Sequence, residues 1–436
     1  MKKLLWLLLL LVLGLLWLVW YLWKVPQTAD CPTPAPSIPA NAVPNQYIVQ
    51  YEEGVDAATV TARTAELEAL GDVLKKQCQC GQQLQLWEVG PGVDIEERGQ
   101  TLEDKTGIDS IDFNVPVQTG PILRLPGNEQ PSPNERNKEF DLWSSPNPPQ
   151  AGAKPVSVAM IDTGVDPAHP GVSAILWKNK QEAAGAGPDD DQNCLENDLM
   201  GWDFAGNDND PTDSSGHGTH LSGLVANGYP NNSGLELMAL RFHDGNDGYL
   251  FDGICAIYYA VDKGAKVINL SWGYYNATPS PALAKALAYA RNKDVLVVTS
   301  AGNEGRDNDA ITEKHWPSDF KLIFDNMLSV AALNYYRTDL PSFSNFGAHS
   351  VDLAAPGTAV ISTLPGGGTG EMSGSSMSAA IVSRTASIIR AQNPEYSAPQ
   401  VRLYILGNTR FLPALVGKVQ SAGALDQAAA FGAAGL

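Results

Sequence analysis

From residue 154 onward, short uninterrupted apolar runs alternate with longer segments in which small and apolar residues recur at helical spacing. The apolar runs predict strands at 156–161, 237–241, 266–271 and 295–300. The other segments predict helices at 254–263, 281–292, 376–390, 398–406 and 422–434. Buried strands that alternate with helices are typical of a mostly parallel sheet with helices on both faces. The pattern therefore predicts an α/β fold for residues 151–436, with a functional site at the carboxyl ends of the strands.

The N-terminal end carries a different signal, an uncharged apolar run from residue 4 to residue 23. This run is long enough for a helix to span a bilayer. No small-residue cleavage site follows it, and aromatic residues gather at its far end, as at a membrane interface. Lys2 and Lys3 favour an N-terminus in the cytoplasm. We therefore expect 4–23 to be an uncleaved transmembrane signal anchor, with everything after it outside the cytoplasm.

Three segments separate this run from the α/β part. Residues 24–44 are rich in proline and predict an extended linker. Residues 45–118 predict a strand, a helix, two strands, a helix and a last strand at 108–117, which is the ferredoxin-like order. Residues 119–150 are again rich in proline and lack periodicity, as in a connector. We therefore expect a small α+β domain between two proline-rich segments.

The charge and the cysteines limit the possible partners. The 436 residues carry a formal net charge of −19, which argues against a nucleic-acid partner, since phosphates attract a basic surface. Five cysteines are too few and too scattered for a disulfide scaffold or a zinc cage, and their pairing stays open. The five are Cys31, Cys78, Cys80, Cys194 and Cys255. The single residue between Cys78 and Cys80 favours strand alternation over a metal site.

Polar residues with catalytic chemistry lie where the predicted elements begin or end. Asp162 and Asn303 each follow a predicted buried strand. His217 lies between two glycines, and Ser376 follows a glycine-rich loop at the start of a helix. Each of these residues, taken alone, is more often a cap or a turn residue than a catalytic group. Together they supply a nucleophile, a base, an orienting acid and an amide donor.

Four motifs around these residues resemble those of the subtilisin-like serine proteases and occur in that family's chain order. The motifs are Val158-Ala-Met-Ile-Asp-Thr-Gly164, Gly216-His-Gly-Thr-His220, Ala301-Gly-Asn-Glu-Gly305 and Gly374-Ser-Ser-Met-Ser378. The resemblance covers the chain from about residue 154 to the C-terminus and implies a subtilisin-like fold. The segment 45–118 is similar to the inhibitory prodomain that precedes such enzymes, which implies an intramolecular inhibitor.

The resemblance also implies roles for individual residues. Ser376 would be the nucleophile, His217 the general base, and Asp162 the acid that orients the imidazole. Asn303 and the backbone N–H of Ser376 would form the oxyanion hole. Two edge segments would pair with an extended polypeptide substrate. These segments consist of Ser271, Trp272 and Gly273, and of Ser300, Ala301 and Gly302.

Two positions near the nucleophile depart from the family pattern. Ser375 replaces the usual threonine, and Ala380 stands where the family usually has proline. Neither change removes a reacting group. We therefore expect both to tune the start of the helix and not to abolish activity.

The acidic loop at 189–198 is the candidate metal site, and it is similar to an aspartate-rich insert in the family. The candidate calcium ligands, with oxygen atoms at alternating positions, are Asp189, Asp191, Asn193 and Asp198. Gln192 and Cys194 replace the glycines of that insert, and a solvated acidic loop without metal is the alternative. A catalytic metal is not expected, because His217 and His220 are three positions apart and lack the glutamate of a zinc-protease helix.

We therefore expect a membrane-anchored, extracytoplasmic serine endopeptidase that is made as a zymogen and processes itself. Because 4–23 precedes the prodomain, a cut between about Gln118 and Glu139 would either release a soluble enzyme or leave it held by the prodomain. The alternative is a catalytically silent protein of the same fold that binds peptides or a regulatory partner. The complete set of four catalytic residue types favours the enzyme.

Overall fold

The computed structural model describes most of the chain between residues 39 and 435, and these residues belong to one unit that runs from Ser37 to Leu436. The described residues are 39, 41–79, 83–103, 105–119, 154–182, 187, 189–227, 234–245, 248–310 and 312–435. The predicted anchor at 4–23 lies outside them, as do most of the linker at 24–44 and nearly all of the connector at 119–150. Within the described ranges, no helix is both long and apolar enough to cross a membrane.

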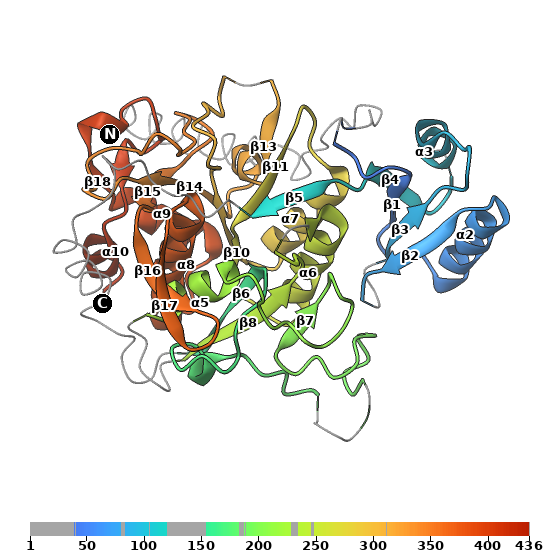
Figure 1. Cartoon of the computed structure of the whole chain (residues 1–436), viewed down its shortest axis with the longest axis horizontal. Helices are drawn as coiled ribbons and strands as arrows, with labels where there is room; N and C mark the ends of the chain where they lie inside the picture. The colour runs from blue at the N-terminus through green and yellow to red at the C-terminus, as the bar shows by residue number, and fades with distance from the viewer. Residues whose placement is uncertain are drawn as a thin grey trace, which may run out of the picture. The chain divides into compact units, whose positions relative to one another are not determined.

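A nine-stranded sheet forms the centre of the α/β part (Figure 1). In spatial order its strands are β18 (Arg410–Phe411), β19 (Gly423–Ala424), β15 (Leu353–Pro356), β14 (Met327–Leu333), β12 (Leu296–Ser300), β10 (Val267–Leu270), β6 (Val156–Asp162), β8 (Leu235–Arg241) and β7 (Gly201–Asp203). Each neighbouring pair from β19 to β7 is parallel, whereas β18 and β19 are antiparallel. Every residue of β6, β10, β12 and β14 is buried, as expected for strands covered on both faces.

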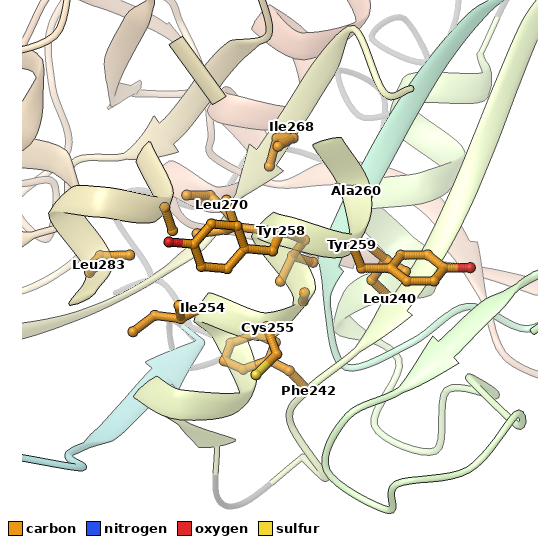
Figure 2. Close-up of a cluster of buried hydrophobic side chains, with 14 of the residues drawn as sticks. Leu240, Phe242, Ile254, Cys255, Tyr258, Tyr259, Ala260, Ile268, Leu270 and Leu283 are labelled. Atoms are coloured by element: carbon orange, nitrogen blue, oxygen red, sulfur yellow. The ribbon is translucent and has the colours of Figure 1, made fainter. Parts of the chain in front are cut away.

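Helices cover both faces of this sheet. They are α5 (His217–Ala226), α6 (Leu250–Asp262), α7 (Pro281–Asn292), α8 (Ser375–Gln392), α9 (Ala398–Gly407) and α10 (Gln427–Ala433). Val158 and Met160 of β6 pack in one core cluster with residues of α5 and α8. Ala159 and Ile161 pack in a second cluster with residues of α6 and α7, part of which Figure 2 shows. The expected α/β fold with a mostly parallel sheet is therefore confirmed.

Residues 46–113 form a four-stranded antiparallel sheet with two helices, which we call the N-terminal subdomain. Its elements are β1 (Gln46–Tyr51), α2 (Ala57–Ala69), β2 (Val73–Gln77), β3 (Leu84–Glu88), α3 (Ile95–Glu103) and β4 (Ile108–Phe113). The spatial order of the strands is β2-β3-β1-β4. Tyr47, Val49, Leu67 and Trp87 contribute to a core of its own. The order of elements along the chain is the one that the sequence predicts.

The prediction of one strand at 108–117 is wrong, because this segment contains parts of two strands. After β4, the strand β5 (Pro116–Thr119) leaves the subdomain and joins a small sheet in the order β13-β11-β5-β9. Its partners are β9 (Gly248–Tyr249), β11 (Trp272–Asn276) and β13 (Lys314–Trp316). The break falls at Asn114, whose Oδ1 accepts a hydrogen bond from Phe251 N at 3.1 Å. A contact with a distant part of the chain therefore separates the two strands.

Two predicted helices also differ from the observed ones. Helix α6 begins at Leu250 and not at 254, since Asn114 supplies an acceptor to its first turn. The helix predicted at 422–434 begins only after Asp426, which accepts a hydrogen bond from Ala429 N at 3.0 Å. The residues before it form β19, because they pair with β15 and β18. A hairpin of β16 (Val360–Leu364) and β17 (Gly368–Met372) precedes α8.

The cysteine pairing that the sequence leaves open is partly resolved. Cys78, directly after β2, forms a disulfide with Cys255 in α6. Cys194 is also disulfide-bonded. The Cys78–Cys255 bond joins the N-terminal subdomain to the α/β part. The sequence predicts only strand alternation for Cys78 and does not predict this covalent link.

Candidate active site

Asp162, His217 and Ser376 lie where elements of the central sheet and its helices begin or end. Asp162 is the last residue of β6, His217 the first residue of α5, and Ser376 the second residue of α8. Helices α5 and α8 contact each other and β6. All three side chains are buried. The fold therefore brings residues from three distant parts of the sequence to the carboxyl edge of the parallel sheet.

The central contact of this site is a hydrogen bond of 2.7 Å between His217 Nδ1 and Asp162 Oδ1. Thr163 N donates to the same carboxylate oxygen at 2.8 Å. Burial lowers the pKa of the imidazole, but the charge and hydrogen bond of Asp162 and the charge of Asp213 outweigh burial. The pKa of His217 is therefore raised above its usual value. Because Asp162 holds Nδ1, the ring has Nε2 available for chemistry.

A second buried carboxylate, Asp213, organises the turn before α5. Its Oδ1 accepts hydrogen bonds from Ser215 N and Gly216 N, both at 2.9 Å, and its Oδ2 accepts one from Thr219 N at 2.8 Å. Gly216 has a φ of 97°, a left-handed conformation that residues with a Cβ rarely adopt. These contacts fix the start of α5 and, with it, the position of His217.

Ser376 does not hydrogen-bond to His217 in this conformation. Ser376 Oγ donates to Ser271 O at 3.4 Å. His217 Nε2 is buried without a hydrogen-bond partner in the described part of the chain. Catalytic hydrogen bonds are often long before a substrate binds and tighten in the complex. The site thus contains an imidazole nitrogen that can still accept a proton.

Asn303, three residues after β12, is held against the start of α8. Asn303 Oδ1 accepts hydrogen bonds from Ser375 N at 2.8 Å and from Ser375 Oγ at 3.0 Å. An added Cβ at Gly374 would lie 3.3 Å from Asn303 Nδ2, so this amide group is next to the loop before Ser376. Ser375 Oγ also lies 3.1 Å from Gly302 O and 3.2 Å from Gly302 N. Ser375 stands where a threonine is usual, and its hydroxyl connects the loop after β12 to α8.

The edge segments predicted to bind substrate flank a cavity of about 370 Å³. Trp272, Gly273, Ser300 and Gly302 line this cavity. Ala301 is fully buried in a core cluster, so a substrate contact at this residue would involve its backbone. The other predicted residue, Ser271, donates from Oγ to Ser376 O at 3.2 Å and so contacts the start of α8.

The chain already supplies an extended strand to one of these segments. In the antiparallel pairing of β5 with β11, Thr119 lies opposite Trp272 and Gln118 lies opposite Gly273. On its other side, β5 pairs with β9. The sequence does not reveal this pairing, because the participating residues are far apart and belong to strands of five residues or fewer.

The acidic loop brings two predicted metal ligands close to a third carboxylate. Glu182, Asp189 and Asp191 each offer one oxygen, and these oxygens lie within 4.8 Å of one another. Asp191 Oδ1 is buried and has no hydrogen-bond partner among the described residues. Its other carboxylate oxygen forms an ion pair with Lys263. Glu182 lies before the predicted loop, so the loop sequence alone does not identify it.

The other two predicted ligands, Asn193 and Asp198, bind each other. Asn193 Nδ2 donates to Asp198 Oδ2 at 2.8 Å, and Tyr259 OH donates to the same oxygen at 2.6 Å. Asn179 Nδ2 donates to Asp198 Oδ1 at 2.7 Å. Asp198 is therefore satisfied by protein donors and is not part of the group around Asp191.

His220 has a contact of its own, away from the Asp162–His217 bond. Its Nε2 lies 3.0 Å from Val360 O and 3.1 Å from Gly370 O. Burial, together with the nearby charge of His217, lowers the pKa of His220 to about 4. A neutral ring that donates to these carbonyls connects α5 to the β16–β17 hairpin.

The fold and the Asp162–His217 pair define a subtilisin-like protein of the α/β class. The profile of the subtilase family matches residues 153–432. The chain therefore belongs to the subtilase family.

Similar proteins agree with this assignment. The thermophilic serine proteinase of Bacillus sp. (strain AK1) is 35% identical over 249 residues, which are 55% of this chain and 53% of that protein. Thermitase of Thermoactinomyces vulgaris is 32% identical over 263 residues, which are 58% of this chain and 80% of that protein. The structure of the epidermin leader peptide processing serine protease of Staphylococcus aureus has a TM-score of 0.64 at 22% identity and matches 90% of this chain and 98% of its own. The chain spans about half the length of the first of these relatives.

The raised pKa of His217 can be measured by NMR. In a Ser376→Ala chain with ¹⁵N-labelled histidines, we expect an apparent pKa above 6.5 for His217. Asp162→Asn should lower this pKa, because burial would then act without the opposing carboxylate. His220, with its pKa of about 4, should stay neutral near pH 6 and serves as an internal reference. A His217 pKa that does not respond to Asp162→Asn would contradict this account of the pair.

Proposed function

We propose that this protein is a serine endopeptidase, and the buried hydrogen bond between Asp162 and His217 carries the proposal. His217 Nε2 accepts the proton of Ser376 while Ser376 Oγ bonds to the carbonyl carbon of a peptide bond. The C–N bond then breaks, and the amine leaves with the proton from His217, so that an acyl-enzyme remains. Water, deprotonated by the same imidazole, hydrolyses the ester and restores Ser376. Asp162 orients the ring and stabilises its positive charge throughout.

The negative charge on the carbonyl oxygen of the intermediate requires hydrogen-bond donors. The proposed donors are Asn303 Nδ2 and the backbone N–H of Ser376. The N–H of Ser376 lies in the first turn of α8, where such groups lack intrahelical acceptors and the helix dipole favours negative charge. Ser375 holds the oxygen of Asn303, so the amide is oriented before substrate binds. Loss of one such donor typically lowers turnover by ~10²–10³.

Extended polypeptides are the proposed substrates. The strand β5 makes backbone pairs with β11 and β9, and a substrate strand can replace it by making the same pairs. Backbone pairing tolerates many sequences, so specificity would come from side chains that enter the neighbouring cavity.

Residues 45–118, which contain the N-terminal subdomain and most of β5, are proposed to be an inhibitory prodomain, because β5 lies where a substrate strand would pair. Two further contacts support this role. Asn114 accepts a hydrogen bond from Phe251 N at the start of α6, and Asp112 accepts one from Ser280 Oγ at the start of α7. Helix starts favour such acceptors through unpaired N–H groups and their partial positive charge. Self-cleavage between about Gln118 and Glu139 would process this zymogen and either release the enzyme or leave it held by the N-terminal subdomain.

A membrane-anchored location outside the cytoplasm is proposed for the catalytic part. The uncharged run at 4–23 would form the anchor, with the N-terminus in the cytoplasm. The Cys78–Cys255 disulfide supports this orientation, because disulfides persist mainly in oxidising compartments. Cleavage after the prodomain would break the continuous chain between the anchor and the protease.

One observation favours a different function, that of a catalytically silent peptide-binding protein. Ser376 Oγ hydrogen-bonds to Ser271 O and not to His217. In a silent protein this arrangement would persist when a peptide binds, and Ser376 would remain unreactive.

A fluorophosphonate probe distinguishes the two functions. We expect it to label the detergent-solubilised chain once self-cleavage and release of the N-terminal subdomain have exposed the site. It should fail with Ser376→Ala, because only an activated serine reacts. The size of the labelled band reports self-cleavage, and its presence in the membrane or soluble fraction reports release. Ser376→Ala should remain full length.

Ser378→Ala is the matched control, since this serine lies in the same helix turn and its hydroxyl donates to Ala355 O. It should label like the unaltered chain. Absence of labelling in folded protein freed of the N-terminal subdomain would reject the protease and favour the silent binding protein.

We also propose a structural calcium ion at Glu182, Asp189 and Asp191. Three carboxylates whose oxygens lie within 4.8 Å of one another repel, and the ammonium of Lys263, which also pairs with Asp198, offsets only part of that charge. Asp191 Oδ1 offers a buried oxygen that lacks a hydrogen-bond donor in the described part of the chain. Calcium accepts such oxygen ligands and would hold the acidic loop to the segment before it.

Chelation tests this site. We expect EGTA to lower the melting temperature of the unaltered chain by about 2 °C or more, since 1 kcal/mol corresponds to roughly 2–4 °C in a domain of 150–250 residues. Asp191→Asn should abolish the response to EGTA. Asp210→Asn, at an exposed residue of a neighbouring loop, should retain it. A melting temperature of the unaltered chain that is equal with EGTA and with added calcium would contradict the proposal.

A further inference from the structure

The Cys78–Cys255 disulfide connects two parts of the chain that lie on opposite sides of the connector in sequence. Cys78 follows β2 of the N-terminal subdomain, and Cys255 lies in α6, 177 positions later. The connector at 119–150 falls between them. A cut anywhere in this connector therefore leaves the two fragments covalently joined through this bond.

Polar contacts next to the disulfide hold the same two parts together. Lys76 Nζ lies 2.8 Å from Asp252 Oδ1 and donates to the backbone oxygens of Phe204 and Ala205 at 3.0 and 3.3 Å. The side chain of Asp252 is only 4% exposed, so departure of Lys76 would leave a buried carboxylate without its charge partner. The subdomain is thus bound at this end by a disulfide and an ion pair, and elsewhere by β5 in its sheet.

We propose that the Cys78–Cys255 disulfide is a latch that keeps the cut N-terminal subdomain on the enzyme until a dithiol reduces it. With the subdomain retained, β5 continues to occupy the strand position beside β11, and the protease stays inhibited. Full activity then requires cleavage of the connector and reduction of this bond. In the unaltered chain the disulfide of Cys194 must be reduced as well, because the cysteines left as its partner, Cys31 and Cys80, also precede the connector in sequence. This inference rests on the proposed protease function and adds a control of the same site.

The reduction is an ordinary thiol–disulfide exchange. One thiolate of the dithiol attacks a sulfur of the Cys78–Cys255 bond, the S–S bond breaks, and a mixed disulfide forms while the other cysteine leaves as a thiolate. The second thiol of the reductant then displaces the remaining cysteine. Two electrons pass from the dithiol to the protein, both cysteines take up protons, and the dithiol ends as a disulfide.

The disulfide should prevent loss of the inhibitor on dilution, because a tethered inhibitor has a fixed effective concentration at its site. An inhibitor held by non-covalent contacts alone dissociates when the protein is diluted below the dissociation constant. A tethered inhibitor meets its site at an effective concentration on the order of millimolar at any dilution. Cys78 is 5% exposed and Cys255 is 2% exposed, so the dithiol needs the interface to open. We therefore expect cleavage to precede reduction.

The first test uses a full chain in which Cys78 and Cys255 are the remaining cysteines. Cys194 is also disulfide-bonded, so Cys31, Cys80 and Cys194 are changed to alanine. Residues 128–134 are replaced by the recognition sequence of a site-specific protease, and Ser376→Ala prevents self-cleavage. After cutting and blocking of free thiols with N-ethylmaleimide, we expect one full-length band on a non-reducing gel and two fragments after dithiothreitol. Two fragments without dithiothreitol would overturn the proposal.

The second test uses the same chain with Ser376 restored. At nanomolar concentration after cutting, hydrolysis of a fluorogenic peptide should rise about tenfold or more with dithiothreitol, as expected for loss of a tether. The matched control carries Cys78→Ala and Cys255→Ala, and it should be active after cutting alone and indifferent to dithiothreitol. Full activity of the cut, unreduced chain with both cysteines would contradict the latch.

A third measurement uses the protein with all its cysteines unchanged. It tests the disulfide even if the cysteine variants fail to fold. Peptide mapping of the unaltered, unreduced chain should yield a cross-linked pair of peptides that contain Cys78 and Cys255. Absence of this pair would refute the latch. The gel with Ser376→Ala does not depend on protease activity. Failure of the probe to label Ser376 would therefore reject the protease, while the gel would still test the tether independently.

Discussion

A buried carboxylate and a buried imidazole, those of Asp162 and His217, share one hydrogen bond at the carboxyl edge of the parallel sheet. A buried charge is costly unless hydrogen bonds and an opposite charge compensate it. The fold provides this compensation through Thr163 N and through the turn that Asp213 organises before α5. Ser376 reaches the same edge because α8 packs against α5 and the sheet. The arrangement of β6, α5 and α8 thus keeps the carboxylate of Asp162 within hydrogen-bonding distance of the His217 imidazole.

The N-terminal subdomain and the segment after it contact helix starts and strand edges of the α/β part. Asn114 and Asp112 provide acceptors at the starts of two helices, and β5 pairs with the free edges of β9 and β11. Inhibition in this arrangement would use the same backbone pairing as substrate binding, so a substrate and the subdomain would compete for one strand position. The Cys78–Cys255 bond changes that competition, because it makes one competitor intramolecular.

The sequence predicts the α/β fold well, because buried strands and small-residue helices leave a clear hydrophobic pattern. It also selects Asp162, His217 and Ser376 as candidate catalytic residues, since a motif that contains glycine surrounds each of them. Other features depend on contacts between distant residues and have no local pattern. Examples are the break at Asn114 that separates β4 from β5 and the approach of Glu182 to the acidic loop. The pairing of cysteines is of the same kind, because a disulfide depends on distance in space and not on spacing in sequence.

In the proposed mechanism, Asp162 acts through His217 to activate Ser376. The most direct measurement is the second-order rate constant for reaction of a fluorophosphonate with the chain, compared between the unaltered protein and Asp162→Asn. We predict a fall on the order of 10⁴, because the imidazole loses the partner that fixes its tautomer and stabilises its charge. A rate constant that is the same in both proteins would contradict the account.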